Sequence, residues 1–217
     1  MNRVWITRTR PAADASADIW RDAGFDPIVE PLLDVQSVPH QPISDQAVLI
    51  FTSKNGIDHI DCAGQRAICV GDATAKHAIK AGFSDVVSVD GTSDDVTKWV
   101  CANVQGSKSL VHISGWHVRG SIIEDLQAEG YAASRVKVYR SIPRTVWPES
   151  PSELVAFYSP LAARTFADLA VGQSLSGLSA ICISQATAEA LSNISLRSVH
   201  IAARPREDEL IMSAKRA

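Results

Sequence analysis

Short, continuous apolar runs alternate along the chain with segments of helical periodicity. The runs Val48–Phe51 and Leu154–Phe157 contain no polar residue, which is typical of strands buried on both faces of a parallel sheet. Between them, the apolar residues of the segment 96–104 recur at helical spacing. This alternation predicts an α/β fold whose parallel strands are joined by right-handed crossovers.

Two local signals mark helix ends. We expect Ser93 or Asp94 to cap the helix that carries the segment 96–104, because a short polar side chain accepts a hydrogen bond from the first helical turn. We expect Gly130 to follow the last turn of a second helix around 122–126, because glycine readily adopts the conformation that ends a helix.

The same succession of motifs occurs twice, with the two copies separated by roughly half the chain. Each copy has a first strand, an amphipathic helix ended by glycine, an extended run and then further strand motifs. Four matches in one order indicate a duplication rather than chance. The matching pairs are Val4–Thr7 with Val111–Ser114, Phe51–Ser53 with Phe157–Ser159, Ala67–Ala75 with Ala180–Ala188, and Val86–Val89 with Val199–Ala202.

Two proline-rich stretches interrupt the pattern. Residues 27–42 hold four prolines and residues 140–151 hold three, as expected of linkers or edge segments. A simple division places one domain in each half. In a second division, the chain starts in one domain, crosses at about 35–45, builds the other domain and returns at about 140–152. The pattern alone leaves both divisions open.

Composition narrows the classes of protein. The chain has 217 residues and a formal net charge of −3, so no global basic field attracts nucleic acid. No run approaches the ~20 apolar residues that span a bilayer, and no export signal is present, so we expect a cytoplasmic protein without membrane contact. Neither the six histidines nor the four cysteines have metal-ligand spacing, so we expect no metal.

An ordered set of motifs resembles the uroporphyrinogen-III synthase family over nearly the whole chain. Each motif is weak alone, and the order makes the set specific. One departure is Ser184, where glycine is usual, which predicts a less tight turn. The motifs are Ile50–Gly56, Val70–Ala75, Arg119-Gly120 with Val138-Tyr139, Phe157–Pro160 and Ile183–Ala188.

The resemblance implies two flavodoxin-like, three-layer α/β/α domains, each with a five-stranded parallel sheet, joined by a two-segment linker. It implies the crossing division. The first domain is 1–35 plus 152–217, the second is 44–140, and the linkers are 36–43 and 141–151. The substrate is expected in the cleft between the two domains.

The resemblance also implies a reaction. Members of the family are lyases of tetrapyrrole (haem) biosynthesis that cyclise hydroxymethylbilane, a linear, carboxylate-rich tetrapyrrole, to uroporphyrinogen III. The terminal ring is inverted and water is lost, with no metal and no organic cofactor. We expect a monomer whose partners are this substrate and, as a candidate, the upstream bilane-forming enzyme.

Candidate substrate-binding residues follow buried strands, where a helix start exposes N–H groups to an anion. Arginine forks can hold a carboxylate in two hydrogen bonds. Two alternatives stay open: that the hydroxyls, Thr74 and Thr187 included, only cap helices, and that the arginines are only solvated. The candidates are Arg8, Ser53, Lys54, Asn55, Thr74, Ser114, Arg119, Ser159 and Thr187.

Tyr139 is the catalytic candidate. It follows the apolar run that precedes the return crossing, and it matches the position of the family's candidate proton donor. A phenol is protonated at neutral pH, so it can assist a departing hydroxyl as a general acid. The alternative is a linker tyrosine that only packs between domains.

A different function class also fits a duplicated α/β pair. The alternative is a two-domain cytoplasmic small-molecule-binding or regulatory protein without catalytic activity. The chain has neither a GxGxxG nor a GxxxxGK[ST] motif, so nucleotide binding has no motif support. The basic segment Thr7–Arg10 follows the first strand, where a receiver-like module needs acidic residues for Mg²⁺.

Overall fold

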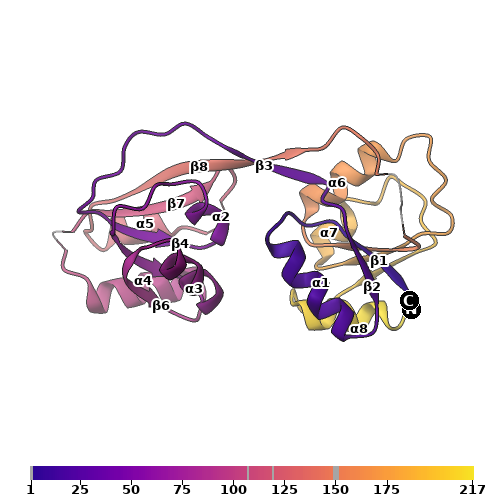
Figure 1. Ribbon diagram of the computed structural model, residues 1–217, viewed down its shortest axis with the longest axis horizontal. Coiled ribbons are helices and arrows are strands. Elements are labelled where there is room, and N and C mark those ends of the chain that lie inside the picture. The colour runs from indigo at the N-terminus through magenta and orange to yellow at the C-terminus, as the bar shows by residue number, and fades with distance from the viewer. Residues whose placement is uncertain (1, 107, 119, 149–151) are drawn as a thin grey trace. The chain divides into compact units, whose positions relative to one another are not determined.

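The computed structural model describes residues 2–106, 108–118, 120–148 and 152–217. The chain divides into two compact units. Unit 1 consists of Met1–Val35 and Ile142–Ala217, and unit 2 consists of Gln36–Ser141. Both chain ends therefore belong to one unit, and the middle of the chain forms the other (Figure 1).

The described residues of unit 1 form one sheet and four helices. Its strands are β1 (Arg3–Ile6), β2 (Asp26–Val29), β9 (Leu154–Phe157), β10 (Ser179–Cys182) and β11 (Ser198–Ile201). Its helices are α1 (Ala12–Asp22), α6 (Pro160–Leu169), α7 (Gln185–Glu189) and α8 (Glu207–Ala214). The sheet order is β11-β10-β9-β1-β2, and every neighbouring pair is parallel.

Alternate strand residues of unit 1 point to opposite faces of the sheet, as the period of a strand requires. On one face, Trp5 and Phe157 pack with the apolar residues of α6. On the other face, Val4 and Ile6 pack with Trp20 of α1 and with α8. Both faces of the sheet are therefore buried, which explains the runs without polar alternation.

Unit 2 repeats this construction. Its strands are β4 (Val48–Phe51), β5 (Arg66–Cys69), β6 (Ser84–Ser88), β7 (Leu110–Gly115) and β8 (Ala133–Pro143), with β3 (Leu33–Ser37) entering from unit 1. Its helices are α2 (Lys54–Ile57), α3 (Asp72–Lys80), α4 (Ser93–Asn103) and α5 (Ile122–Ala128). The sheet order is β3-β8-β7-β4-β5-β6.

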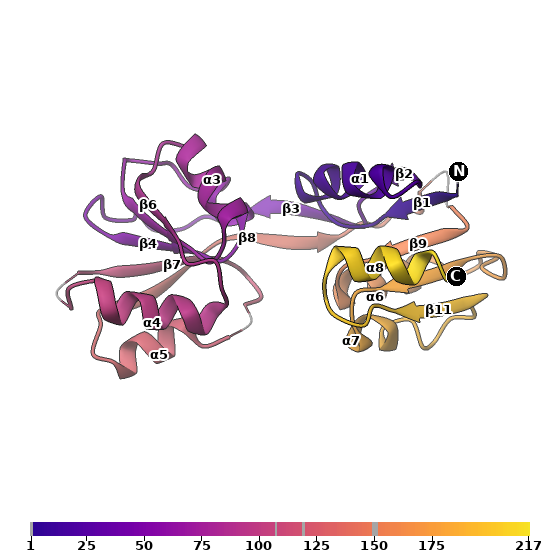
Figure 2. The ribbon, with the colours of Figure 1, turned by 90° about the horizontal axis from the view of Figure 1, so that it is seen from below.

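The two faces of this sheet are also covered by helices. Leu49 and Phe51 pack with residues of α2 and α3, whereas Val48 and Ile50 pack with residues of α4 and α5. Figure 2 shows α3 on one side of the sheet and α4 and α5 on the other. The pairs that link β8, β7, β4, β5 and β6 are all parallel, so the predicted α/β fold with parallel strands is confirmed.

The duplication explains why the two sheets match. By the repeat, β7 corresponds to β1, β4 to β9, β5 to β10 and β6 to β11. With this correspondence, β8-β7-β4-β5-β6 and β2-β1-β9-β10-β11 are the same order. Each sheet therefore joins the first strands of one copy to the later strands of the other.

The crossing segments change the predicted strand count. β3 lies beside β8 in the sheet order, and the Val38 N–H donates to the Val138 carbonyl at 2.8 Å. The sheet of unit 2 thus has six strands instead of the expected five, because the outgoing crossing pairs with the returning one. Parts of the expected linkers 36–43 and 141–151 are strand, which satisfies backbone groups that an open linker leaves to water.

Helix ends follow the predicted chemistry with one shift. The cap predicted at Ser93 or Asp94 is wrong: Thr92 is the N-cap of α4, and Asp95 completes a capping box with it. Gly130 follows α5 with a φ of 86°, as expected of the residue that ends a helix.

Candidate functional site

The carboxyl ends of parallel strands meet at one edge of each sheet, and open α/β sheets bind ligands beyond that edge. In unit 2, β4 ends at Phe51 and β7 ends at Gly115. The register pairs Gly115 with Tyr139 of β8. Tyr139, the catalytic candidate, therefore lies at the carboxyl edge. The turn that carries Ser53, Lys54 and Asn55 follows a strand of the same sheet.

The side chain of Tyr139 is half-buried against two neighbours. Its ring stacks on the imidazole of His59, with centroids 5.6 Å apart and planes 26° apart. A Cβ added to Gly115 would come within 2.8 Å of two atoms of the Tyr139 ring. Gly115 therefore leaves the space that the ring occupies. The backbone is held as well, because the Trp116 N–H donates to the Tyr139 carbonyl at 2.8 Å.

The hydrogen bonding of its hydroxyl distinguishes Tyr139 from the other two tyrosines. The Tyr158 hydroxyl donates to Glu207 at 2.6 Å, and the Tyr131 hydroxyl donates to the Val104 carbonyl at 3.0 Å. Within the described part of the chain, the Tyr139 hydroxyl makes no hydrogen bond. Tyr139 is thus the tyrosine whose hydroxyl has no partner of its own among those residues.

Cationic and aromatic groups lie on β8 or directly after β7 and β4, the strands of this edge. Trp116 is 50% exposed although it is a large aromatic residue, and the Lys137 ammonium lies 4.8 Å from the centroid of its ring. Lys54 is half-buried at the start of α2 and has no ion pair among the described residues. These side chains offer a carboxylate a positive charge at the carboxyl edge.

The predicted hydroxyl residues of unit 2 play different parts. Ser53 is the N-cap of α2 and accepts from the Asn55 N–H at 3.2 Å, so it satisfies its own turn. Asn55 itself is half-buried. Ser114 is buried, and its hydroxyl donates to the Gly115 carbonyl at 3.2 Å.

Thr74 and Thr187 occupy equivalent places in the two units, inside the first turn of a helix. The N-caps are Gly71 for α3 and Ser184 for α7, so the interpretation of the two threonines as caps is wrong. Thr187 is fully buried and shares a hydrogen bond of 3.0 Å with the Ser184 hydroxyl. Thr74 is 7% exposed.

The replacement of glycine by Ser184 does not loosen its turn. Gly71 has φ −155° and ψ 166°, and Ser184 has φ −161° and ψ 164°. Both are extended conformations that any residue adopts, and a Cβ at Gly71 would meet nothing within 4 Å. The expected difference in tightness is therefore absent, because this turn does not require glycine.

A buried histidine lies inside the sheet of unit 2, on β7. His112 of β7 is 1% exposed and shares a hydrogen bond of 3.2 Å with the Thr52 hydroxyl through Nε2. Burial and, to a smaller extent, the nearby Arg135 charge lower the pKa of His112 to about 4, against an opposing effect of Glu124. His112 is therefore neutral at physiological pH.

The carboxyl edge of unit 1 contains a closed polar network. Arg8 follows β1, and its guanidinium donates to the Ser16 hydroxyl at 3.1 Å and lies 3.5 Å from the Glu207 carboxylate. The Ser16 hydroxyl also donates to Glu207 at 3.0 Å. Arg8, a predicted carboxylate ligand, therefore already faces a carboxylate of its own unit.

Tyr158 completes this network. Its ring lies 4.6 Å from the Arg8 guanidinium, and the Trp20 indole donates to its hydroxyl at 2.8 Å. Burial and the adjacent Glu207 carboxylate raise the pKa of Tyr158 well above its usual range, so its phenol stays protonated and donates. The next residue, Ser159, caps α6 and accepts from the Ala162 N–H at 3.2 Å.

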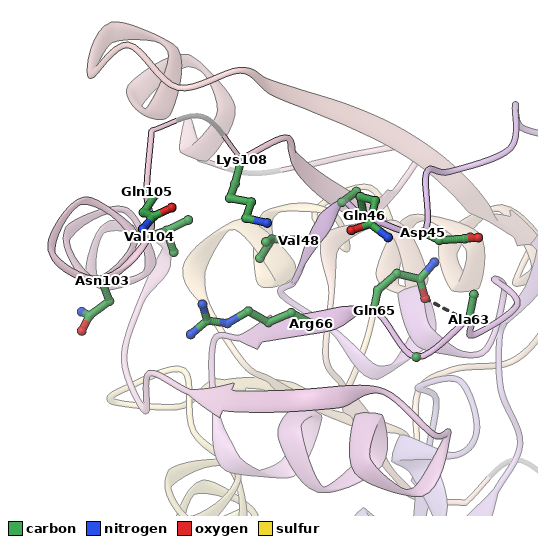
Figure 3. Close-up of a pocket in the computed structure, with 12 residues that line it drawn as sticks. Asp45, Gln46, Val48, Ala63, Gln65, Arg66, Asn103, Val104, Gln105 and Lys108 are labelled. Carbon is green, nitrogen blue, oxygen red and sulfur yellow. Dashed lines mark hydrogen bonds between the residues drawn. The ribbon is translucent and has the colours of Figure 1, made fainter.

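The opposite edge of the unit 2 sheet carries a cavity of about 580 Å³. Figure 3 shows Arg66 and Lys108 among the side chains that line it, together with Gln46, Gln65 and Asn103. These residues lie before or at the start of strands, or at the end of α4, so the cavity lies at the amino ends of the strands. None of the predicted site residues that the structure describes lines this cavity.

Arg119, another predicted carboxylate ligand, lies outside the described residues. Among the residues that are described, no group of three or more His, Cys, Asp or Glu side chains is placed to hold a metal ion. In the same residues, no helix is long and apolar enough to cross a membrane.

Sequence reasoning missed three residues that the structure brings into contact with predicted ones. His59 stacks on Tyr139, Gly115 makes room for it, and Glu207 binds the group around Arg8. The glycine directly after Ser114 was a usable signal, because a strand glycine often marks a close approach. His59 and Glu207 lie in no recognisable pattern.

Comparison with known families decides the class. The model of the family described as uroporphyrinogen-III synthase HemD matches residues 14–212. This chain belongs to the uroporphyrinogen-III synthase family. Uroporphyrinogen-III synthases are lyases of tetrapyrrole biosynthesis that cyclise hydroxymethylbilane, so the predicted function is confirmed, and the non-catalytic alternative is not favoured.

The solved structure of a family member from Helicobacter pylori agrees at the level of fold. The chain is similar to uroporphyrinogen-III synthetase from Helicobacter pylori, with 18% identity, a TM-score of 0.66 and coverage of 100% of this chain and 99% of that one. It also matches uroporphyrinogen III synthase from the extremely thermophilic bacterium Thermus thermophilus, with 18% identity, a TM-score of 0.42 and coverage of 100% and 97%. Comparison with curated protein sequences gives no match.

Proposed function

We propose that this uroporphyrinogen-III synthase uses Tyr139 as its general acid and binds substrate carboxylates at the carboxyl edges of its sheets. The observation that carries the proposal is the placement of Tyr139 opposite the last residue of β7, with a hydroxyl that has no partner among the described residues. Tyr158 and Tyr131 do not compete for this role, because their hydroxyls are already used.

The chemical step requires few groups of the protein. The Tyr139 hydroxyl gives its proton to the departing hydroxyl of the substrate's hydroxymethyl group, which leaves as water. The electron pair of the adjacent pyrrole nitrogen forms the new double bond of an azafulvene. The terminal ring then attacks through its substituted carbon, and a spiro intermediate breaks and recloses with that ring inverted. The phenolate retakes a proton lost from the tetrapyrrole, so the net loss is one water.

Carboxylate binding rests on the ends of the longer helices and on nearby cations. The first turns of α3 and α6 follow strands of the carboxyl edges, and the N-terminus of a helix favours an anion by about 0.3–1 kcal/mol. Lys54 supplies a half-buried charge beside Ser53 and Asn55. Arg8, Arg119, Ser114, Ser159, Thr74 and Thr187 remain candidates for further contacts.

Holding the substrate in one curled conformation is the second task. A restricted geometry converts ring closure into a favoured unimolecular step. We assign this task to the carboxyl edges of the sheets as a whole, rather than to a single side chain. The inverted product should therefore survive most single substitutions.

Finer parts of the proposal concern the fold and surroundings of the enzyme. The shared order of the matched strands supports a flavodoxin-like description of each unit, since it corresponds to the order 2-1-3-4-5. We further propose a cytoplasmic monomer that works without metal or organic cofactor and receives its substrate from the upstream bilane-forming enzyme.

The deciding experiment is an isomer assay. Freshly prepared hydroxymethylbilane is incubated with the protein after exhaustive dialysis against a chelator, and the products are oxidised and separated as porphyrin isomers. We expect the inverted isomer to dominate only when the protein is present. An isomer mixture identical to that of the protein-free reaction would overturn the assignment, and activity that returns only with an added ion would overturn the absence of a metal.

A further inference from the structure

The stack of His59 on Tyr139 ties the candidate acid to a second part of unit 2. His59 lies in the segment between α2 and β5, and Nδ1 of its ring shares a hydrogen bond of 2.8 Å with the Ser37 hydroxyl. Ser37 is the last residue of β3, and Tyr139 lies on the neighbouring strand β8. The imidazole is therefore held by one strand while it packs on the side chain of the next.

We propose that His59 is a positioning residue that fixes the direction of the Tyr139 phenol. This inference rests on the proposed role of Tyr139 as the general acid. The Trp116 N–H holds the backbone of Tyr139 and Gly115 lies close to its ring, but no hydrogen bond holds the phenol among the described residues, which leaves it some freedom about its two side-chain torsions. The imidazole stacked on the phenol is itself held by a hydrogen bond, and it removes that freedom.

The geometry separates positioning from proton relay. In the stack, the planes of the two rings are only 26° apart, so the faces meet. The ring nitrogens of His59 lie in the plane of the imidazole, and Nδ1 is already directed to Ser37. His59 therefore acts on Tyr139 through ring contact, and the phenolic hydroxyl stays available to the substrate.

Ring contact predicts which substitutions preserve activity. His59→Ala removes the ring, whereas His59→Phe keeps an aromatic face and loses only the bond to Ser37. A displaced acid slows proton transfer without changing carboxylate binding. We expect His59→Ala to lower kcat by about tenfold with KM nearly unchanged, and His59→Phe to restore most of the loss.

The test compares kcat and KM of these variants in the wild-type and Tyr139→Phe backgrounds. We expect His59→Ala to have almost no effect once the Tyr139 hydroxyl is gone, because the two changes remove the same contribution. His40→Ala is the matched control, since His40 is an exposed histidine of the same unit and bonds only to the adjacent Gln41 carbonyl among the described residues. A similar loss in both backgrounds, or no rescue by phenylalanine, overturns the inference.

A second readout does not depend on activity. The chain has three tyrosines, so fluorotyrosine labelling gives few ¹⁹F NMR signals, and the Tyr139 signal is the one missing in Tyr139→Phe. We expect this signal to move in His59→Ala and to return toward its original position in His59→Phe, because the neighbouring ring face is restored. An unmoved signal overturns the stack even in an active enzyme. A wild-type protein without synthase activity overturns the proposed function instead.

Discussion

Tyr139 and His112 show how the surroundings of one side chain decide its chemistry. Tyr139 lies at the carboxyl edge with a half-buried ring and a hydroxyl that has no described partner. His112 lies within the buried part of β7 and is bound to Thr52. In our proposal the first group gives a proton to the substrate, whereas burial keeps the second neutral.

We expect Tyr139→Phe to lower turnover and to leave KM nearly unchanged. General acid catalysis contributes about 10²–10⁴-fold, and we expect the low end or less because the pyrrole nitrogen itself expels the hydroxyl. Steady-state kinetics with isomer analysis checks this, and the inverted isomer should remain the main product. Wild-type turnover in a variant whose chemistry limits the rate would remove Tyr139 as the acid.

His112 should make stability fall in mild acid. Its pKa is about 4 in the folded protein and about 6.5 in an unfolded chain. Between these values the unfolded state binds a proton that the folded state does not, so the free energy of unfolding decreases as pH falls from about 6.5 to about 4. The loss amounts to at most about 3 kcal/mol.

Urea unfolding of the wild type and of His112→Gln at a series of pH values measures this contribution. The decrease below pH 6.5 should be smaller in His112→Gln, since the neutral amide has no proton to gain. The less buried His117, changed to Gln, is the control and should leave the decrease intact. Parallel curves for the wild type and His112→Gln would show that His112 is not responsible.

At the scale of elements, the contact between β7 and β8 links the fold to the site. The strands are in register up to Ser114, and an irregularity then brings Gly115 opposite Tyr139. At this position the backbone of β7 passes so close to the Tyr139 ring that only a residue without Cβ fits the observed arrangement. The strand pair therefore places the phenol as directly as any side chain does.

We expect Gly115→Ala to reduce turnover several-fold with little loss of stability. The new methyl group would lie 2.8 Å from two ring atoms of Tyr139, and the ring must move because the backbone is fixed in the sheet. The free energy of unfolding should change by about 1 kcal/mol or less, as a single side-chain end takes up the strain. Kinetics and urea unfolding test both statements.

Gly177→Ala serves as the matched control for this prediction, because a Cβ at Gly177 would meet nothing within 4 Å. It should change neither turnover nor stability. If Gly115→Ala had the turnover of the wild type, the position of the ring against β7 would be irrelevant to the reaction.

At the scale of the whole molecule, each unit has a core of its own made from both copies of the repeat. In unit 1, β1 pairs with β9, and in unit 2, β4 pairs with β7. In each pair, the number of residues between the two strands is more than half the length of the unit. A cut through the middle of the chain would break both sheets, whereas cuts just before β3 and just after β8 would break neither.

A fragment of residues 33–143, which keeps β3 and β8 whole, should therefore unfold cooperatively. It retains the two apolar clusters on either face of its sheet. The control fragment 1–105 lacks β7 and β9 and should show no cooperative transition. Urea titrations followed by circular dichroism measure both, and a cooperative 1–105 fragment with an unstructured 33–143 fragment would contradict this division.

Local periodicity by itself determined the α/β class, the buried strands and the end of α5 at Gly130, because each of these depends on residues a few positions apart. Comparison of the two halves of the sequence revealed the duplication. The family's reaction was also predictable, since its motifs are short and occur in order. The tertiary structure alone decided how β3 joins β8, how Glu207 meets Arg8 and how His59 stacks on Tyr139. Those contacts join residues that are far apart in the sequence. The local sequence pattern around one partner carries no information about the other.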